Sequence, residues 1–183
     1  MEELEKELED LPENFIVGVV MPNDKYEEAN MHLLSFLINR KKSSGGYVSV
    51  SKPYSSILNS LKNKEISTDN IQFIDCISKG LGGEICKGDK CVLVESPAHL
   101  TELGIALHDY FTSTGEKNRF VYIDSISSLL IHNNMDSILK FVHSVTGKMR
   151  VFGFNGIILS QHEESDQKLT SQLSQFCDKV IHL

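Results

Sequence analysis

The sequence lacks any apolar run close to the ~20 residues that a helix needs to span a bilayer, so we expect no membrane segment. The N-terminus is acidic and carries no signal-peptide pattern, which favours a cytoplasmic protein. Basic residues are in the minority, with 18 Lys and Arg against 25 Asp and Glu, and the net charge is −7. This balance argues against nucleic acid as a partner, because neutralising phosphates requires clustered Lys and Arg.

Cysteines are few, and the four present fit a reducing compartment at least as well as a disulfide framework. Cys86 and Cys91 flank a glycine-containing turn and could pair or form half of a metal site. A zinc site needs about four ligands, and the sequence offers no second close pair of Cys or His. We therefore expect free thiols at Cys76, Cys86, Cys91 and Cys177 rather than zinc ligands.

The 183 residues predict one main domain with a short N-terminal extension. Residues 1–12 predict a short acidic helix whose leucine stripe docks on the body or on a partner, and docking on the body is the simpler hypothesis. Residues 13–183 predict a single α/β domain, with no internal repeat and no long low-complexity linker. The glycine-rich residues 79–83 predict a loop or hairpin, because no helix follows them directly, as a dinucleotide fingerprint would require.

Strand and helix patterns alternate along the domain. Apolar, β-branched runs predict strands, and amphipathic segments between them predict helices. Strands are expected at 14–21, 46–51, 71–77, 91–95, 120–124, 156–161 and 179–183, and helices at 24–42, 53–62, 100–111 and 134–148. This alternation predicts a three-layer α/β/α fold with a predominantly parallel sheet and right-handed crossovers.

The stretch from Arg119 to Leu130 is the most informative part of the sequence. An apolar run ends in Asp124, and small hydroxyl residues and a helical pattern follow. A continuous apolar run is typical of a strand buried on both faces, and the carboxyl end of such a strand is where open α/β sheets bind ligands. In nucleotide hydrolases this position holds the carboxylate that orients magnesium. Asp124 is thus a candidate magnesium ligand, although the favoured hypothesis is a structural acceptor for Ser125, a loop N–H or Lys25.

Four segments, in order, resemble RecA-like ATPases of the KaiC type. Residues 46–51 resemble the strand after the P-loop helix, 97–107 the helix before Walker B, 119–130 the Walker B strand and the helix after it, and 157–162 the strand that senses the γ-phosphate. The similarity extends over residues 14–183 and implies a RecA-like, P-loop NTPase-type sheet. It also implies side-by-side assembly, either as a homo-oligomer or with a related active ATPase.

The resemblance breaks at the phosphate-binding loop, whose pattern is G-x-x-x-x-G-K-[ST]. Residues 19–26 occupy this place, and only Lys25 matches. Val19 and Asp24 replace the glycines, and Tyr26 replaces the hydroxyl residue that binds magnesium. The Asp24 carboxylate is placed near the helix N-terminus, where a phosphate would bind. We expect Lys25 to pair with Asp24, Glu28 or Asp124 rather than with an anion.

The pair of glutamates that KaiC-type enzymes carry after the second strand is also replaced, by Ser51 and Lys52, and neither is a plausible base. We therefore expect no enzyme, no cofactor and a regulatory or scaffolding role through protein–protein assembly. The alternative is a nucleotide-binding protein with weak or no ATP hydrolysis. Its vestigial site would use Lys25, Asp124, Ser125 and Gln161, with ATP and magnesium as ligands.

Two other classes are less consistent with the sequence. A phosphate-accepting Asp124 would require an acidic pair at the same sheet edge, and the first strand ends without one. A serine hydrolase would require a G-x-S-x-G elbow, and the serine-rich turn at 125–128 does not contain it.

Overall fold

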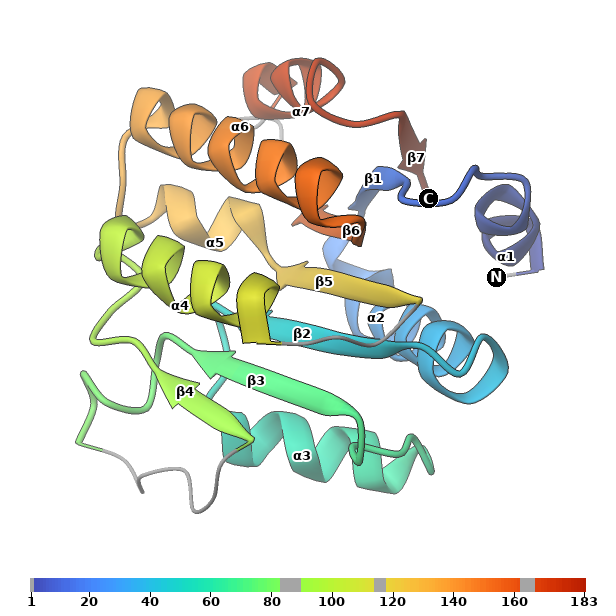
Figure 1. The fold of residues 1–183 in the computed structure, drawn as a ribbon, viewed down its shortest axis with the longest axis horizontal. Helices are drawn as coiled ribbons and strands as arrows, with labels where there is room; N and C mark the ends of the chain where they lie inside the picture. Colours follow the sequence, from blue (N-terminus) through green and yellow to red (C-terminus); the bar gives the residue numbers. More distant parts are fainter. Residues whose placement is uncertain (1, 83–89, 114–117, 162–166) are drawn as a thin grey trace.

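The computed structural model describes residues 2–82, 90–113, 118–161 and 167–183, and within them the chain forms one seven-stranded sheet (Figure 1). The strands are β1 (Ile16–Met21), β2 (Ser44–Ser49), β3 (Ile71–Asp75), β4 (Cys91–Leu93), β5 (Arg119–Asp124), β6 (Asn155–Gln161) and β7 (Lys179–His182). Their order is β4-β3-β2-β5-β6-β1-β7, and every neighbouring pair is parallel. The predicted three-layer, parallel α/β fold is confirmed.

Helices flank the sheet on both faces (Figure 1). They are α1 (Glu2–Glu9), the 3₁₀ turn η1 (Asn23–Lys25), α2 (Tyr26–Ser35) with its π-helical continuation η2 (Phe36–Arg40), α3 (Tyr54–Asn63), α4 (Leu100–Ser113), α5 (Ile126–Leu130), α6 (Met135–Phe152) and α7 (Gln167–Leu173). The sequence did not predict α7, whose residues are mostly polar. The chain's periodicity predicted the long, amphipathic helices.

Two separate apolar cores lie on the two faces of the sheet. Alternate strand residues such as Val17 and Tyr122 pack against α1, α2 and α3, whereas Ile16 and Ile123 pack against α4, α5, α6 and α7. This division follows from the period-two alternation of side chains along a strand. Side chains on the face of the sheet that packs against α2 therefore lie on the opposite side from α4 and α6.

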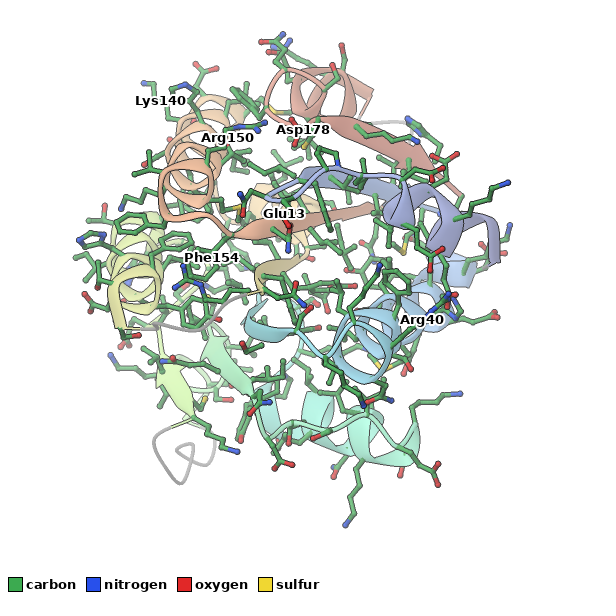
Figure 2. The ribbon with its side chains drawn as sticks, turned by 45° about the vertical axis from the view of Figure 1, so that its right-hand side comes forward. Glu13, Arg40, Lys140, Arg150, Phe154 and Asp178 are labelled. Carbon is green, nitrogen blue, oxygen red and sulfur yellow. The ribbon has the colours of Figure 1, made fainter. Side chains whose placement is uncertain are left out.

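Helix α1 lies against the body of the domain. Its Leu4 and Leu8 side chains are 1% and 3% exposed, as the leucine stripe predicts for docking on the chain itself. Acidic residues on the same helix form ion pairs with Arg40, whose position near α1 is labelled in Figure 2, and with Lys179 of β7. Apolar burial supplies most of the attachment, because ion pairs between partly exposed side chains contribute little.

The cysteines fit the expectation of free thiols only in part. Cys76 and Cys177 are free, whereas Cys91 is disulfide-bonded. Cys86 lies outside the described residues. Among the described residues no group of three or more His, Cys, Asp or Glu is placed to hold a metal ion.

No helix in the described parts of the chain has the length and apolar character to cross a membrane.

Two glycines in helix interiors offer a test of helix stability. A Cβ built at Gly104 of α4 or at Gly147 of α6 meets nothing within 4 Å. Gly104→Ala and Gly147→Ala are expected to raise the free energy of unfolding by roughly 0.5–1 kcal/mol each, because alanine loses less backbone entropy in a helix. Urea unfolding measures this. Gly45→Ala is the contrasting variant: its Cβ would lie 2.1 Å from the Phe120 ring, so a loss of stability is expected there.

Candidate functional site

The connection from β1 to α2 occupies the place of the phosphate-binding loop. Val19 pairs with Leu159 of β6 and Ile181 of β7, so β1 continues through residues that the loop pattern would need. Only Pro22 and the turn η1 separate β1 from α2. The Lys25 N–H donates to the Pro22 carbonyl at 3.1 Å, and the first N–H of α2 donates to Asn23. These two backbone donors are therefore used within the turn.

Lys25 is exposed at this turn and makes no ion pair within the described part of the chain. The expected pairing with Asp24, Glu28 or Asp124 is therefore not found. The reason is geometric: Lys25 lies on a surface turn, and the Asp124 carboxylate already has other hydrogen-bond donors.

Asp124 ends β5 and is only 2% exposed. Its Oδ2 accepts a hydrogen bond from Asn30 Nδ2 at 2.9 Å and another from the Tyr47 hydroxyl, and its Oδ1 accepts one from the Tyr26 hydroxyl. The Tyr122 hydroxyl in turn donates to Asn30 Oδ1 at 2.8 Å. These five residues, which we call the Asp124 network, satisfy a buried carboxylate without a cation.

The donors in the Asp124 network differ from those that the sequence suggested, which were Ser125, a loop N–H and Lys25. Tyr26 and Asn30 are four residues apart on α2 and therefore share one helix face. Tyr47 and Tyr122 are partners in the β2–β5 register, with their rings stacked at 5.4 Å. Two sequence patterns could therefore have indicated these partners: the four-residue spacing on α2 and the alternation of side chains along β5.

Burial raises the pKa of the Tyr26, Tyr47 and Tyr122 phenols well above the usual value, and the nearby Asp124 charge raises it further. A phenol with a raised pKa stays protonated and remains a hydrogen-bond donor. The network thus keeps its donors at any ordinary pH.

Ser125 and Gln161 are held through the N-terminus of α5. Ser125 is buried and caps this helix, accepting from the Ser128 N–H at 3.4 Å. The Gln161 N–H donates to Ser127 Oγ at 3.0 Å, which ties the end of β6 to the same turn. The peptide bond between Asp124 and Ser125 is cis. Of the four predicted site residues, Asp124, Ser125 and Gln161 lie at this end of β5 and β6. Within the described part of the chain, the Lys25 side chain forms no hydrogen bond or ion pair with them.

Ser51 and Lys52, which the sequence resemblance aligns with the glutamate pair of KaiC-type enzymes, lie at the surface near α2. Lys52 Nζ forms an ion pair with Glu27 at 3.2 Å, and Ser51 is exposed. An ammonium paired with a carboxylate has no free lone pair with which to accept a proton from water.

Asp75 is a second buried carboxylate, and no motif in the sequence marks it. It accepts from the backbone N–H groups of Tyr54 at 2.8 Å, Ile77 at 2.7 Å and Ser78 at 2.9 Å. These bonds join the end of β3 to the start of α3, so Asp75 has a structural role.

The fold resembles that of solved structures, including the following two. One is the uncharacterized protein PH0321 from Pyrococcus horikoshii in complex with an unknown peptide, with a TM-score of 0.74 and 13% identity over 100% of this chain and 82% of that chain. The other is the KaiC-like protein PH0186 from Pyrococcus horikoshii OT3, with a TM-score of 0.65 and 12% identity over 94% of this chain and 74% of that chain. At such identities the likeness shows a RecA-like fold and nothing further.

No curated protein matches the sequence. One family model matches residues 51–183, which is most of the chain and begins after β2. The chain therefore belongs to DUF7504, a family of unknown function.

Proposed function

We propose that this protein is a RecA-like domain that neither binds nor hydrolyses ATP and that acts as a regulatory or scaffolding module by assembling with protein chains. The observation that carries the proposal is the Asp124 network. Tyr26 and Tyr47 donate to the carboxylate that would hold magnesium in an active relative. The protein's own phenols thus replace the ion.

Magnesium would have to break these bonds before it could bind. The ion requires near-octahedral oxygen ligands and retains several waters, which need space beside the carboxylate. Asn30, Tyr26 and Tyr47 fill that space, and each hydrogen bond to a charged group contributes about 1.5–3 kcal/mol. The folded chain therefore opposes magnesium binding with several kcal/mol of its own interactions.

The charges around the start of α2 also oppose a bound nucleotide. Asp24, Glu27 and Glu28 lie in η1 and in the first turn of α2, where they complement the helix dipole themselves. A phosphate at this helix end would meet three carboxylates, of which Glu27 is paired with Lys52, and the exposed Lys25, so negative charge is still in excess. This balance repels polyanions rather than attracting them.

Protein chains are the partners that the fold favours. RecA-like domains usually assemble side by side. The structurally similar protein PH0321 was solved in complex with an unknown peptide. A homo-oligomer or a complex with a related active ATPase would use the same framework without nucleotide chemistry. The proposed role thus needs the fold but not the phosphate site.

Calorimetry with Mg-ATP tests the proposal. We expect no binding heat at millimolar nucleotide, no phosphate release, and the same mass by light scattering with and without Mg-ATP. Binding in the micromolar range would overturn the proposal.

A second candidate keeps weak nucleotide binding at Lys25, Asp124, Ser125 and Gln161, and one observation favours it: Lys25 is exposed and makes no ion pair within the described residues. Under our proposal Lys25→Ala changes the free energy of unfolding by no more than about 0.5 kcal/mol and alters no ligand response. Protection of Lys25 from acylation by Mg-ATP would support the second candidate instead.

A further inference from the structure

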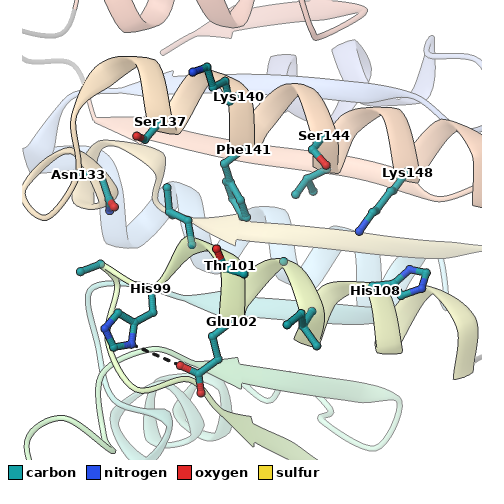
Figure 3. Close-up of a pocket in the computed structure, with 15 residues that line it drawn as sticks. His99, Thr101, Glu102, His108, Asn133, Ser137, Lys140, Phe141, Ser144 and Lys148 are labelled. Carbon is teal, nitrogen blue, oxygen red and sulfur yellow. Dashed lines mark ion pairs between the residues drawn. The ribbon is translucent and has the colours of Figure 1, made fainter.

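Helices α4 and α6 lie side by side on one face of the sheet and form a groove of about 990 Å³ between them (Figure 3). The apolar side chains that line it are Leu100 and Ile105 of α4 and Phe141 and Val145 of α6, of which the two on α6 are largely buried, with 8% and 2% exposed. Ile105 is 58% exposed, which is high for a large apolar side chain. This α4–α6 groove therefore presents apolar surface to solvent between two rigid helices.

Small residues keep the α4–α6 groove open. Gly104 lies on its α4 side, and a Cβ at this position would meet no atom within 4 Å. Ser137 and Ser144 lie on its α6 side, one on each side of Phe141 along the helix (Figure 3). A guest side chain can therefore approach both helix backbones.

The unpaired charge along the α4–α6 groove is positive, although the whole chain carries −7. Lys140 and Lys148 lie on the α6 side, and neither makes an ion pair among the described residues. The acid in the groove, Glu102, already contacts Lys79 at 3.7 Å and His99 at 3.6 Å. A partner at the groove would therefore face the unpaired positive charges of Lys140 and Lys148, whereas the charge of Glu102 is already balanced by neighbouring basic groups.

We propose that the α4–α6 groove is the docking site for an acidic amphipathic helix of a partner protein. The lining runs over about nine residues of α4, or roughly 13 Å, which matches two to three turns of a guest helix. Apolar side chains at i, i+4 and i+7 of the guest would pack between Ile105 and Phe141. Its acidic residues would face Lys140 and Lys148.

This inference rests on the proposed function, but it concerns a different surface. The Asp124 network faces α2, on the opposite side of the sheet from α4 and α6. Binding at the groove and binding at Asp124 can therefore be measured separately.

Two designed peptides of about 16 residues, roughly 24 Å as helices, are the probes. Both carry the same leucine stripe, and one has Glu and the other Lys at every remaining polar position. In ¹H–¹⁵N spectra of the whole protein we expect the acidic peptide to shift resonances of α4 and α6, and to bind at least about ten-fold more tightly than the basic one. Equal binding, shifts confined to other elements, or no binding at millimolar peptide would overturn the inference.

Charge reversal tests the two lysines directly. Lys140→Glu with Lys148→Glu is expected to weaken the acidic peptide about ten-fold and to improve the basic one. Lys62→Glu with Lys64→Glu makes the same change in net charge at the C-terminal end of α3, across the sheet, and should leave both affinities within about two-fold. Equal losses in the two double variants would show a response to net charge alone and would contradict a specific groove.

Gly104→Trp fills the groove without an internal clash at Cβ and is expected to abolish the peptide-induced resonance shifts in α4 and α6.

A second copy of the chain or single-stranded DNA that shifts the same resonances and displaces the peptide would be a different occupant. Either result would overturn the choice of an acidic helix. If Mg-ATP binds and the acidic peptide still binds the groove, only the proposed loss of nucleotide binding is contradicted. If Mg-ATP does not bind and the acidic peptide also fails to bind the groove, only the groove proposal is contradicted.

Discussion

Asp124→Ala is expected to lower the free energy of unfolding by about 3–5 kcal/mol. The substitution removes the acceptor of three buried donors, which belong to Tyr26, Asn30 and Tyr47. Each orphaned donor costs roughly 1–3 kcal/mol, and relief of the buried charge offsets part of the sum. A carboxylate kept free for magnesium would behave in the opposite way, because removing it would leave stability unchanged or raised.

Chemical denaturation of a variant series measures this effect and its origin. Tyr26→Phe and Tyr47→Phe, added to Asp124→Ala, remove the two hydroxyls that the alanine leaves without a partner. We expect the triple variant to be about 1–3 kcal/mol more stable than the sum of the separate losses predicts. Strictly additive losses would contradict a shared network.

The domain is expected to lose stability steeply above about pH 9. Burial raises the pKa of the Cys76 and Cys177 thiols to about 12, and burial with the Asp124 charge raises the pKa of Tyr26, Tyr47 and Tyr122 beyond the alkaline range. The unfolded chain therefore releases these protons first. The associated stability is fully present below the unfolded pKa values, near 9 for the thiols and 10 for the phenols, and is lost as the pH rises above them.

The free energy of unfolding is expected to fall steeply with pH. Each group contributes about 1.4 kcal/mol per pH unit between its unfolded and folded pKa, so three phenols contribute about 4 kcal/mol per unit above pH 10. With a typical stability of 5–15 kcal/mol, the domain is expected to unfold within about three units above pH 9.

Circular dichroism and tyrosinate absorbance, recorded together along a pH titration, test this. We expect the absorbance of the buried phenols to rise only as the secondary structure is lost. A Cys76→Ala, Cys177→Ala variant removes the thiol contribution and should shift the onset of instability from about pH 9 to about pH 10. Titration of all tyrosines in the folded state would contradict the burial of the network.

The sheet could be predicted from the sequence because its strands are short apolar runs separated by amphipathic helices. Strand β5 is the clearest case, since its run from Phe120 to Ile123 is buried on both faces and ends in a single Asp. Helix α7 was missed because Gln167–Leu173 contains only two apolar residues to mark a periodic face. Its packing depends on contacts that no local pattern contains.

The partners of Asp124 could not be predicted in the same way. Tyr26 and Tyr47 lie 98 and 77 residues away along the chain, and only the sheet order brings them to β5. The loop pattern places Val19 at a glycine position, although its β-branched side chain favours the strand that it occupies. Residue types at the carboxyl end of β5 were thus predictable, whereas their hydrogen bonds required the fold.

The most direct measurement is a ¹H–¹⁵N spectrum of the whole protein with Mn-ATP, in which the paramagnetic ion stands in for magnesium. Our account predicts no selective broadening of the amides of Tyr26, Asn30 and Ser125 at millimolar Mn-ATP, because phenol and amide donors already occupy the Asp124 carboxylate. Selective broadening of these three amides, abolished in Asp124→Asn, would place a metal nucleotide at this edge of the sheet and contradict the account.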